Sequence, residues 1–530
     1  MSRWAKPQED RDQLVMFTRR LDETIPEDHP VRLLAEILER IDWAEWERRY
    51  HPRLGQPAIH PRVMAAVLLY GLMTRVRSSR GLEEALEMRI DFRWLAEGRR
   101  MDHSTLSDFR HKFGAELKNL FVQVGLLARE MQLLSLSRLA FDGTRIKANN
   151  RRSGSRTPEE LRNLRNELQQ KFEELEQQAA KADAQDQEVY GNGSPQRLPE
   201  ELADVKRRCR KIDQVLAELK RVEEAGEAVP KRIPLTDPES RITPNKEGGF
   251  APNFTPLAAV DVGSGLIVSN DVIALMNEEQ HLIPALEDVQ QQFGLEELPA
   301  EVLVDGLFPT GENLAALEDR NVTLYSPVPL PDPAKNPALR EDPTQPVPEA
   351  LWKQLPTRMV KPPRGEKRPQ LEKSAFVYDS ERDCYWCPQG KPMTCCKQTS
   401  ENRLSGVRIE RRRYQAAAAD CAECPLKSLC LQNQSKPREI TRDQFEEHRE
   451  RLARRMATPE AQEKYRQRRH PGERPFAVVK QQFGARQFLL RGLKKVRTEW
   501  CWLTTAFNLK LLMRHWRGWS GRAPPGLASS

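Results

Sequence analysis

The sequence predicts an α/β protein built on a mixed sheet, with an all-helical domain before the sheet. Two observations carry this prediction. Residues 28–130 repeat apolar side chains at helical spacing, whereas residues 254–325 read as two strands followed by a strand, a helix and another strand. A strand pair followed by strand–helix–strand is typical of an α/β fold with antiparallel and parallel neighbours.

The helical domain is expected over residues 1–130. Pro61 suits the first turn of a helix, and Asp102 or Ser104 can cap the helix that follows. In that helix Arg110 and Lys112 are expected to point outward, where they could contact DNA. Short helices ending in a basic one fit a helix-turn-helix, but an ordinary helical bundle fits equally well, because the motif has no strict sequence signature.

The sheet is expected over residues 134–330, interrupted by a charged helical hairpin at 155–230 whose turn contains Gly191, Gly193 and Pro195. Its predicted elements are listed in chain order: a strand over Arg138–Lys147 with Asp142 and Gly143 near its middle; a strand pair, Phe254–Asp261 and Gly265–Ser269; a helix over about Asn277–Phe293; a strand over Ala300–Val304 ending at Asp305; a helix capped by Thr310; and a strand over Val322–Tyr325.

Three further segments follow. Residues 331–375 read as a Pro-rich connection, residues 376–440 as a cysteine module, and residues 441–520 as a basic helical segment that completes the core.

Residues 451–530 hold 18 Lys and Arg against four Asp and Glu, a net charge of +14, whereas the other 450 residues carry −6. Such a segment attracts polyphosphate, because each neutralised phosphate releases condensed counterions. A solvated basic tail is the simpler alternative.

Composition excludes some classes of protein. The longest apolar stretch, Met64–Met73, is too short to cross a bilayer, so we expect no membrane association. The first residues lack the apolar core of a secretory signal, so a cytoplasmic protein is expected. Nine cysteines in such a chain favour reduced thiols or metal ligands over a disulfide framework.

Three acidic residues stand out by context. Asp142 lies in a strand, Asp305 ends a buried strand, and Glu473 lies in the basic C-terminal segment. Carboxylates at strand ends can project into a cleft, and hard divalent cations prefer their oxygens. Pro471 and Pro475 bracket the expected start of a helix on which Glu473 and Lys480, seven apart, share a face. On spacing alone, ordinary Asp-Gly turns and strand ends are the more common explanation of these aspartates.

Four cysteines form a second candidate metal site. Cys387, Cys421, Cys424 and Cys430 contain one tight C-x-x-C pair, which suits two adjacent corners of a tetrahedral Zn²⁺ site. Cys384 makes a competing pair with Cys387. Reduced structural cysteines in a ribbon without metal are the alternative.

The C-terminal helix alternates basic and aromatic residues. We expect its basic side chains to follow DNA phosphates while Trp500, Trp502 and Phe507 pack inward, and base stacking by the tryptophans is the weaker interpretation. The basic residues are Arg491, Lys494, Lys495 and Arg497.

Four blocks carry a resemblance to a known family: FDGTRIKANN, AAVDVGSGLIVSNDV, VLVDGLFPTGENLAALE and ERPFAVVKQQFGARQFLLRGLKKVRTEWCWLTTAFNLK. In this order they resemble bacterial insertion-sequence transposases of the DDE type, over about residues 28–515. The resemblance implies an RNase H-like core in which Asp142, Asp305 and Glu473 bind two Mg²⁺ or Mn²⁺ ions. By the same resemblance, Arg468 and Lys480 correspond to basic residues that contact DNA. Tyr465 falls in the sequence signature around Glu473.

The function expected from this resemblance is that of a transposase that binds the terminal inverted repeats of its element, cuts the DNA at the element end and joins it to target DNA. The partners would be double-stranded DNA and further copies of the chain, in the cytoplasm at the nucleoid. A catalytically inactive, transposase-derived DNA-binding protein is the main alternative, and a stand-alone nuclease is a third.

Overall fold

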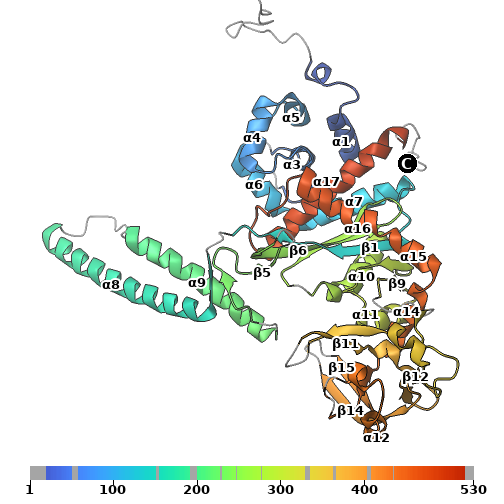
Figure 1. The fold of residues 1–530 in the computed structure, drawn as a ribbon. Coiled ribbons are helices and arrows are strands. Elements are labelled where there is room, and N and C mark those ends of the chain that lie inside the picture. Colours follow the sequence, from blue (N-terminus) through green and yellow to red (C-terminus); the bar gives the residue numbers. More distant parts are fainter. Residues whose placement is uncertain are drawn as a thin grey trace, which may run out of the picture.

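The computed structural model describes residues 20–50, 58–150, 154–190, 200–226, 229–245, 248–275, 277–328, 335–361, 366–402, 407–431, 433 and 435–519. A helical domain, a central sheet and a smaller β-rich module follow one another in space, and a long helical hairpin projects from the sheet (Figure 1). The expected hairpin turn at Gly191, Gly193 and Pro195 lies outside the described residues, as do parts of the Pro-rich connection.

The N-terminal domain is helical, as predicted. Pro30 and Pro61 begin their helices, where a missing N–H costs nothing, and the Asp102 carboxylate accepts the Thr105 N–H at 2.8 Å as a cap. One expectation is wrong: Arg110 points inward and donates to the carbonyl of Arg77. The elements are η1 Leu21–Thr24, α1 Pro30–Glu39, α2 Ala44–Glu47, α3 Pro61–Met73, α4 Ser79–Met88, α5 Ile90–Leu95, α6 His103–Lys112 and α7 Gly114–Glu130.

The C-terminal helix α17, Leu493–Trp519, joins this domain to the sheet. It packs against α3 and α7 on one side and against strand β7 on the other (Figure 1). Trp500, Trp502 and Phe507 are buried in the core, as predicted. Their burial leaves no exposed ring on which a base could stack, so the stacking interpretation is wrong.

The central sheet mixes antiparallel and parallel neighbours, as predicted. Strand β6 lies between β7 and β1, antiparallel to both, and β8 and β9 continue the sheet parallel to β1. The predicted strand over 138–147 is present as β1 and β2, which keep one register along β6 on either side of a break at residues 144–145. The strands are β1 Arg138–Gly143, β2 Ile146–Lys147, β5 Arg241–Pro244, β6 Phe250–Asp261, β7 Ile267–Ile273, β8 Glu301–Leu303 and β9 Thr323–Tyr325.

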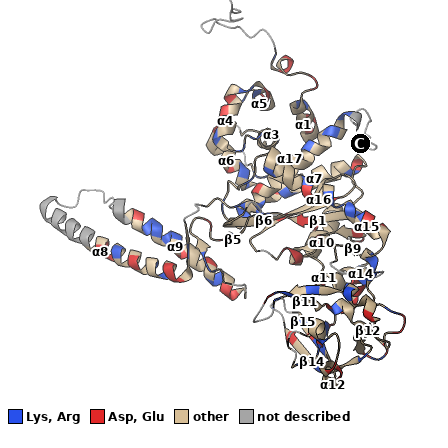
Figure 2. Ribbon diagram, viewed as in Figure 1, with Lys and Arg blue, Asp and Glu red and all other residues tan. Residues whose placement is uncertain are grey.

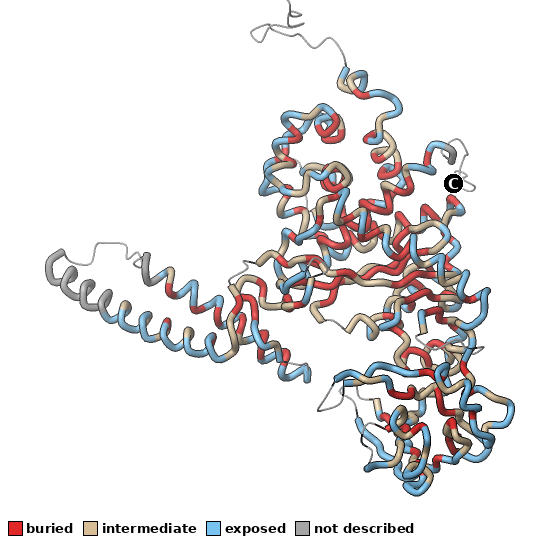
Figure 3. Tube along the Cα trace, in the orientation of Figure 1, coloured by how far each residue is buried: buried red, intermediate tan, exposed pale blue. Residues whose placement is uncertain are grey.

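Helices between these strands are short and cover the sheet. The expected helix over 277–293 is divided into η2, Glu278–His281, and α10, Leu282–Phe293. Thr310 caps α11, Gly311–Asp319, as predicted. One continuous hydrophobic core includes side chains of the helical domain, the sheet and α17, and Figure 3 shows this buried interior along the strands. The helical domain and the sheet therefore form one packed unit.

The predicted insertion is a pair of long helices, α8 Pro158–Tyr190 and α9 Glu200–Glu224. Its base is closed by the short strands β3 Ser155–Arg156 and β4 Ile233–Pro234. Leu161, Val215 and Leu219 belong to a small core of its own, and charged residues of both signs are spread along the described parts of both helices (Figure 2). Among the described residues, no helix combines the length and apolar character needed to cross a membrane.

The cysteine-containing module has a five-stranded antiparallel sheet in the order β12 to β16. The segment expected as a plain connection contains elements of its own, and its Val347 and Leu371 pack in the same core as Tyr385 and Tyr414. The elements are η4 Glu349–Gln354, β10 Thr357–Val360, β11 Arg368–Leu371, η5 Lys373–Ala375, β12 Val377–Asp379, β13 Cys384–Trp386, β14 Pro392–Asn402, β15 Arg408–Ala416, α12 Ala418–Ala422, α13 Lys427–Cys430 and β16 Glu439–Asp443.

Candidate active site

The register of two parallel strands brings Asp142 and Asp305 to the same edge of the sheet. Ala140 of β1 is aligned with Leu303 of β8, and each aspartate follows its aligned residue by two positions. Neighbouring strands lie about 4.8 Å apart, so the two aspartates emerge side by side. Gly143 N–H donates to Asp142 Oδ1 at 2.9 Å, and Leu307 N–H donates to Asp305 Oδ1 at 2.9 Å. Backbone donors thus hold both carboxylates in place.

A third carboxylate beside them, Glu278, was not predicted from the sequence. Burial, followed by the charges of Asp142 and Asp305, raises the pKa of Glu278 to about 7. Its carboxylate lies against Gly143 so closely that a Cβ there would clash with it. Its turn η2 is fixed because the Asn313 amide donates to the carbonyl of Glu279 at 2.8 Å and to that of Phe308 at 2.9 Å. The only signal in the sequence was an acidic residue soon after a strand, which is too common to single out.

Glu473 lies on helix α16, Arg469–Ala477, which packs against β1 and β6. The helix begins before Pro471 and contains Pro475, so the two prolines do not bracket its start as predicted. It continues into the π-helical turn η6, Val478–Gln482. Pro471, Pro475 and Phe476 are buried, and Phe476 stacks on Trp500 with ring centroids 6.0 Å apart. Glu473 is on the exposed side of this anchored helix.

Two basic residues tie this helical segment to the strand of Asp142. Arg468 Nη2 lies 3.0 Å from Asp142 Oδ2, and Lys480 Nζ donates to Thr144 Oγ1 at 2.5 Å. Glu473 lies between them in the sequence, so both ends of its helical segment are fixed beside β1. Tyr465 lies close to these residues. Burial raises the pKa of its hydroxyl, and the charges of Arg468, Asp305 and Asp142 also act on it.

These side chains are oxygen donors of the kind that Mg²⁺ and Mn²⁺ prefer. In the described part of the chain, however, no group of three or more His, Cys, Asp and Glu side chains is placed so that it could hold a metal ion. Because Asp142 is paired with Arg468, its carboxylate would have to exchange that partner for a cation. The residues therefore fit a hard cation by their chemistry, but this arrangement has not assembled a coordination shell.

The other basic residues expected to bind DNA divide into two groups. Lys112, Lys494 and Lys495 are exposed. Arg491 and Arg497 are already engaged, with the Asn149 carbonyl at 3.1 Å and with Asp271 at 2.7 Å. The exposed lysines are available to an anion, whereas the two arginines also support the fold.

The four candidate zinc ligands lie close enough to influence one another. Burial, together with the charges of neighbouring thiols, raises the pKa of Cys387 and brings that of Cys430 to about 12. Cys421 and Cys424 are among these neighbours, and all four thiols are free. Among the described residues, these cysteines likewise do not form a group of three or more side chains placed to hold a metal ion. Zinc at this position therefore stays a prediction.

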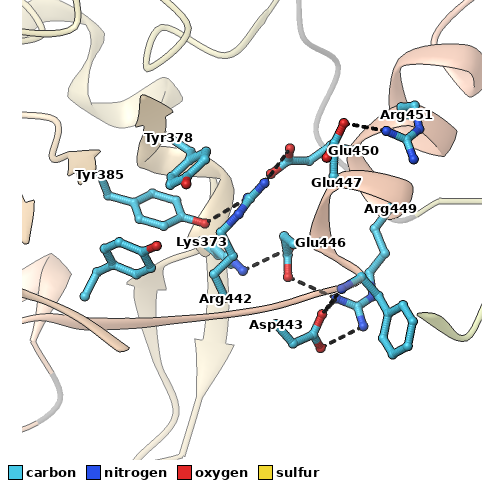
Figure 4. Close-up of polar contacts among 12 residues, drawn as sticks. Lys373, Tyr378, Tyr385, Arg442, Asp443, Glu446, Glu447, Arg449, Glu450 and Arg451 are labelled. Carbon is cyan, nitrogen blue, oxygen red and sulfur yellow. Dashed lines mark hydrogen bonds and ion pairs between the residues drawn. The ribbon is translucent and has the colours of Figure 1, made fainter. Parts of the chain in front are cut away.

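Helix α14, Glu446–Met456, fixes the module to the sheet. On the module side Lys373 pairs with Glu446 at 2.8 Å, and Arg442 pairs with Glu450 at 2.5 Å (Figure 4). On the core side Arg451 pairs with Glu318 of α11 at 2.6 Å. Helix α15, Pro459–Arg466, then leads directly to α16. The module is thus held in a fixed position relative to the helix that carries Glu473.

Comparison with protein families gives two matches. Residues 19–112 match a family described as "Transposase domain (DUF772)", and residues 386–513 match a "Transposase DDE domain". The second match contains Glu473 but neither aspartate. A comparison with curated proteins finds no match.

The chain therefore carries transposase domains in its N-terminal helices and in its C-terminal part. Together these domains support an insertion-sequence transposase of the DDE type. The DDE domain implies an RNase H-like core, and the mixed sheet of β7, β6, β1, β8 and β9 agrees with it.

Proposed function

We propose that this protein binds the terminal inverted repeats of an insertion sequence and catalyses DNA cleavage and strand transfer. The observation that carries the proposal is the parallel register of β1 and β8, which sets Asp142 beside Asp305 in a chain with a transposase DDE domain. Two such carboxylates on neighbouring strand ends suit chemistry at a phosphodiester better than a purely structural role, because their mutual repulsion costs stability.

In this proposal Asp142, Asp305 and Glu473 would hold two Mg²⁺ or Mn²⁺ ions, which when bound stabilise the charge of an in-line displacement at phosphorus. The chain's own residues orient the DNA. Arg468, once released from Asp142, becomes a donor for a phosphate oxygen next to the reacting bond. Lys480, anchored near Thr144, places a second positive charge on the same side. Exposed Lys112, Lys494 and Lys495 would extend the contact along the duplex by neutralising phosphates.

The reaction is expected in two parts. Water first attacks the phosphodiester at the element end and leaves a free 3′-OH, and this hydroxyl then attacks target DNA. The DNA complex is proposed to contain more than one copy of the chain, since both ends of an element must be processed, and to form in the cytoplasm at the nucleoid. Metal analysis of the purified protein would decide whether the four cysteines hold zinc.

Cleavage of DNA containing the element end tests the proposal. Wild type should cut it with Mg²⁺ and fail without it, whereas Asp142→Asn, Asp305→Asn and Glu473→Gln should each lose at least about 100-fold in rate. Glu463→Gln is the matched control, because Glu463 is exposed on α15 and pairs with Arg466. Equal cleavage by all five proteins would reject the assignment. Salt-sensitive DNA binding without cleavage by the wild type would instead support an inactive DNA-binding protein.

A further inference from the structure

A buried ion pair connects the N-terminal helical domain to the loop that follows the Glu473 helix. Arg77, between α3 and α4, lies 2.8 Å from Glu499 of α17. Only 12% of the Arg77 side chain and 6% of the Glu499 side chain are exposed. Such a pair needs further hydrogen bonds, because two charges taken out of water are costly unless their remaining donors and acceptors are satisfied. The partners that supply these bonds all belong to one segment, residues 484–490, whereas the buried Arg77 Nε has no partner among the described residues.

Arg77 and Glu499 bind this segment through its backbone. Arg77 donates to the carbonyls of Gly484 and Gln487, each at 2.8 Å, while Glu499 accepts the N–H groups of Leu489 and Leu490 at 2.9 Å. The planar guanidinium reaches three acceptors at once, which a lysine ammonium on its flexible stem cannot reproduce in the same geometry. The backbone of 484–490 is therefore held by two side chains from outside the sheet.

The opposite side of the segment is bound to the chain that leads away from Asp142. Phe488 N–H donates to the Lys147 carbonyl at 2.9 Å, and the Asn149 amide donates to the Leu489 carbonyl at 2.6 Å. The segment thus lies between the ion pair and residues 147–149, directly after the turn η6 that carries Lys480. A shift of 484–490 would move both the end of the Glu473 helical segment and the residues beyond Asp142.

We propose that Arg77, together with Glu499, is a positioning residue for the reaction, and that the N-terminal helical domain is thereby a structural part of the catalytic centre. This inference rests on the proposed function. Arg77 pairs with Glu499 and not with Asp142, Asp305 or Glu473, and it acts through the backbone of 484–490. Its loss should slow the chemical step far more than it weakens DNA binding, because Lys112, Lys494 and Lys495 lie on helices α6 and α17, which also pack against each other.

The test uses the full-length chain with Arg77→Lys and Arg77→Met, and with Arg93→Met as the matched control, since Arg93 is exposed on α5. Cleavage of end DNA should fall at least tenfold in Arg77→Met and less in Arg77→Lys. The Kd for end DNA should stay within threefold of wild type. Amide hydrogen exchange at Leu489 and Leu490 should become faster in both Arg77 variants and stay unchanged in the control.

The readouts separate the two proposals. Wild-type protein that never cleaves end DNA would reject the proposed function, yet hydrogen exchange would still decide whether Arg77 fixes the segment. Unchanged exchange, or cleavage by Arg77→Met within twofold of wild type, would overturn the positioning role. An equal loss of binding and cleavage would also overturn it, because Arg77 would then act on DNA directly. If Arg77→Met does not fold, Arg77→Lys carries the same comparison.

Discussion

Arg468 and Asp142 form an ion pair at 3.0 Å, with only 13% and 18% of their side chains exposed. The arginine comes from the helical segment of Glu473, and the aspartate comes from the strand that runs parallel to that of Asp305. The pair therefore places one positive charge beside the carboxylates and occupies an oxygen of Asp142 that a cation would need.

Replacing this arginine should make cation binding easier. In Arg468→Gln, the Kd for Mn²⁺ should fall roughly threefold to tenfold, since the cation no longer competes with a guanidinium for Asp142. Isothermal titration with Mn²⁺ in the absence of DNA measures this directly. Arg466→Gln, on the neighbouring helix and 73% exposed, is the control and should leave the Kd unchanged. Weaker Mn²⁺ binding by Arg468→Gln would contradict the competition.

The ionised carboxylate of Glu278 should lower the free energy of unfolding at neutral pH. Its pKa in the folded protein is about 7 against an ordinary value of 4.5, so the folded state binds this proton more tightly. Wild type therefore loses stability as pH rises from 4.5 to about 7 and keeps the full penalty above that. Because Glu278 is only partly buried, we expect Glu278→Gln to be about 1–2 kcal/mol more stable at pH 8.

Urea unfolding at pH 8 and pH 4.5 checks this expectation, and the gain should vanish at the lower pH. Glu279→Gln is the neighbouring control and should show little change at either pH. A gain of the same size at both pH values would show that ionisation of Glu278 is not its cause.

Gly143 should tolerate no side chain while Glu278 is present. A Cβ at this position would meet the Glu278 carboxylate and, at 2.9 Å, Leu257 Cδ2. Gly143→Ala should therefore destabilise the protein by about 2–4 kcal/mol, of which Glu278→Ala in the same chain should recover a large part. A double-mutant cycle by denaturant unfolding measures this coupling. Strictly additive effects would show that the clash is absorbed elsewhere.

Glu318 should be required for firm attachment of the module. It accepts hydrogen bonds from Arg451 at 2.6 Å and from His448 at 2.7 Å across the contact between α11 and α14. Glu318→Gln removes the charge from both bonds, and we expect a loss of about 1–2 kcal/mol. Thermal unfolding compared with Glu297→Gln, which changes an exposed glutamate, provides the measurement. Equal melting temperatures for both variants would refute the role of Glu318.

Much of the local structure could be predicted from the sequence, because it depends on neighbours along the chain. The cap at Asp102, the helix start at Pro61, the turn after Asp261 and the cap at Thr310 are short-range features, and each forms as expected, unlike the helix start expected between Pro471 and Pro475. The inward packing of the α17 aromatics was also predicted, but helical spacing did not show that Trp500 and Trp502 lie on different sides of the helix, where they donate to Leu257 of the sheet and Arg110 of the helical domain.

Other features depend on partners far away in the chain. Arg110 looked like a surface residue of a basic helix end, yet α6 packs on α17 and turns it inward. Glu278 lies more than 130 residues from Asp142 and has no motif of its own. Its place beside both aspartates arises only when η2 is held against the loop after β8.

The sequence alone therefore determined the order of the elements, since periodicity, caps and turns depend on consecutive side chains, and it indicated Asp142, Asp305 and Glu473 as candidates but not Glu278. Only the tertiary structure decided which charges meet. The strand register sets Asp142 beside Asp305, and the packing of distant elements brings Arg468 and Glu278 to this site and joins Arg77 to Glu499. These contacts depend on long-range packing, which leaves no regular spacing in the chain.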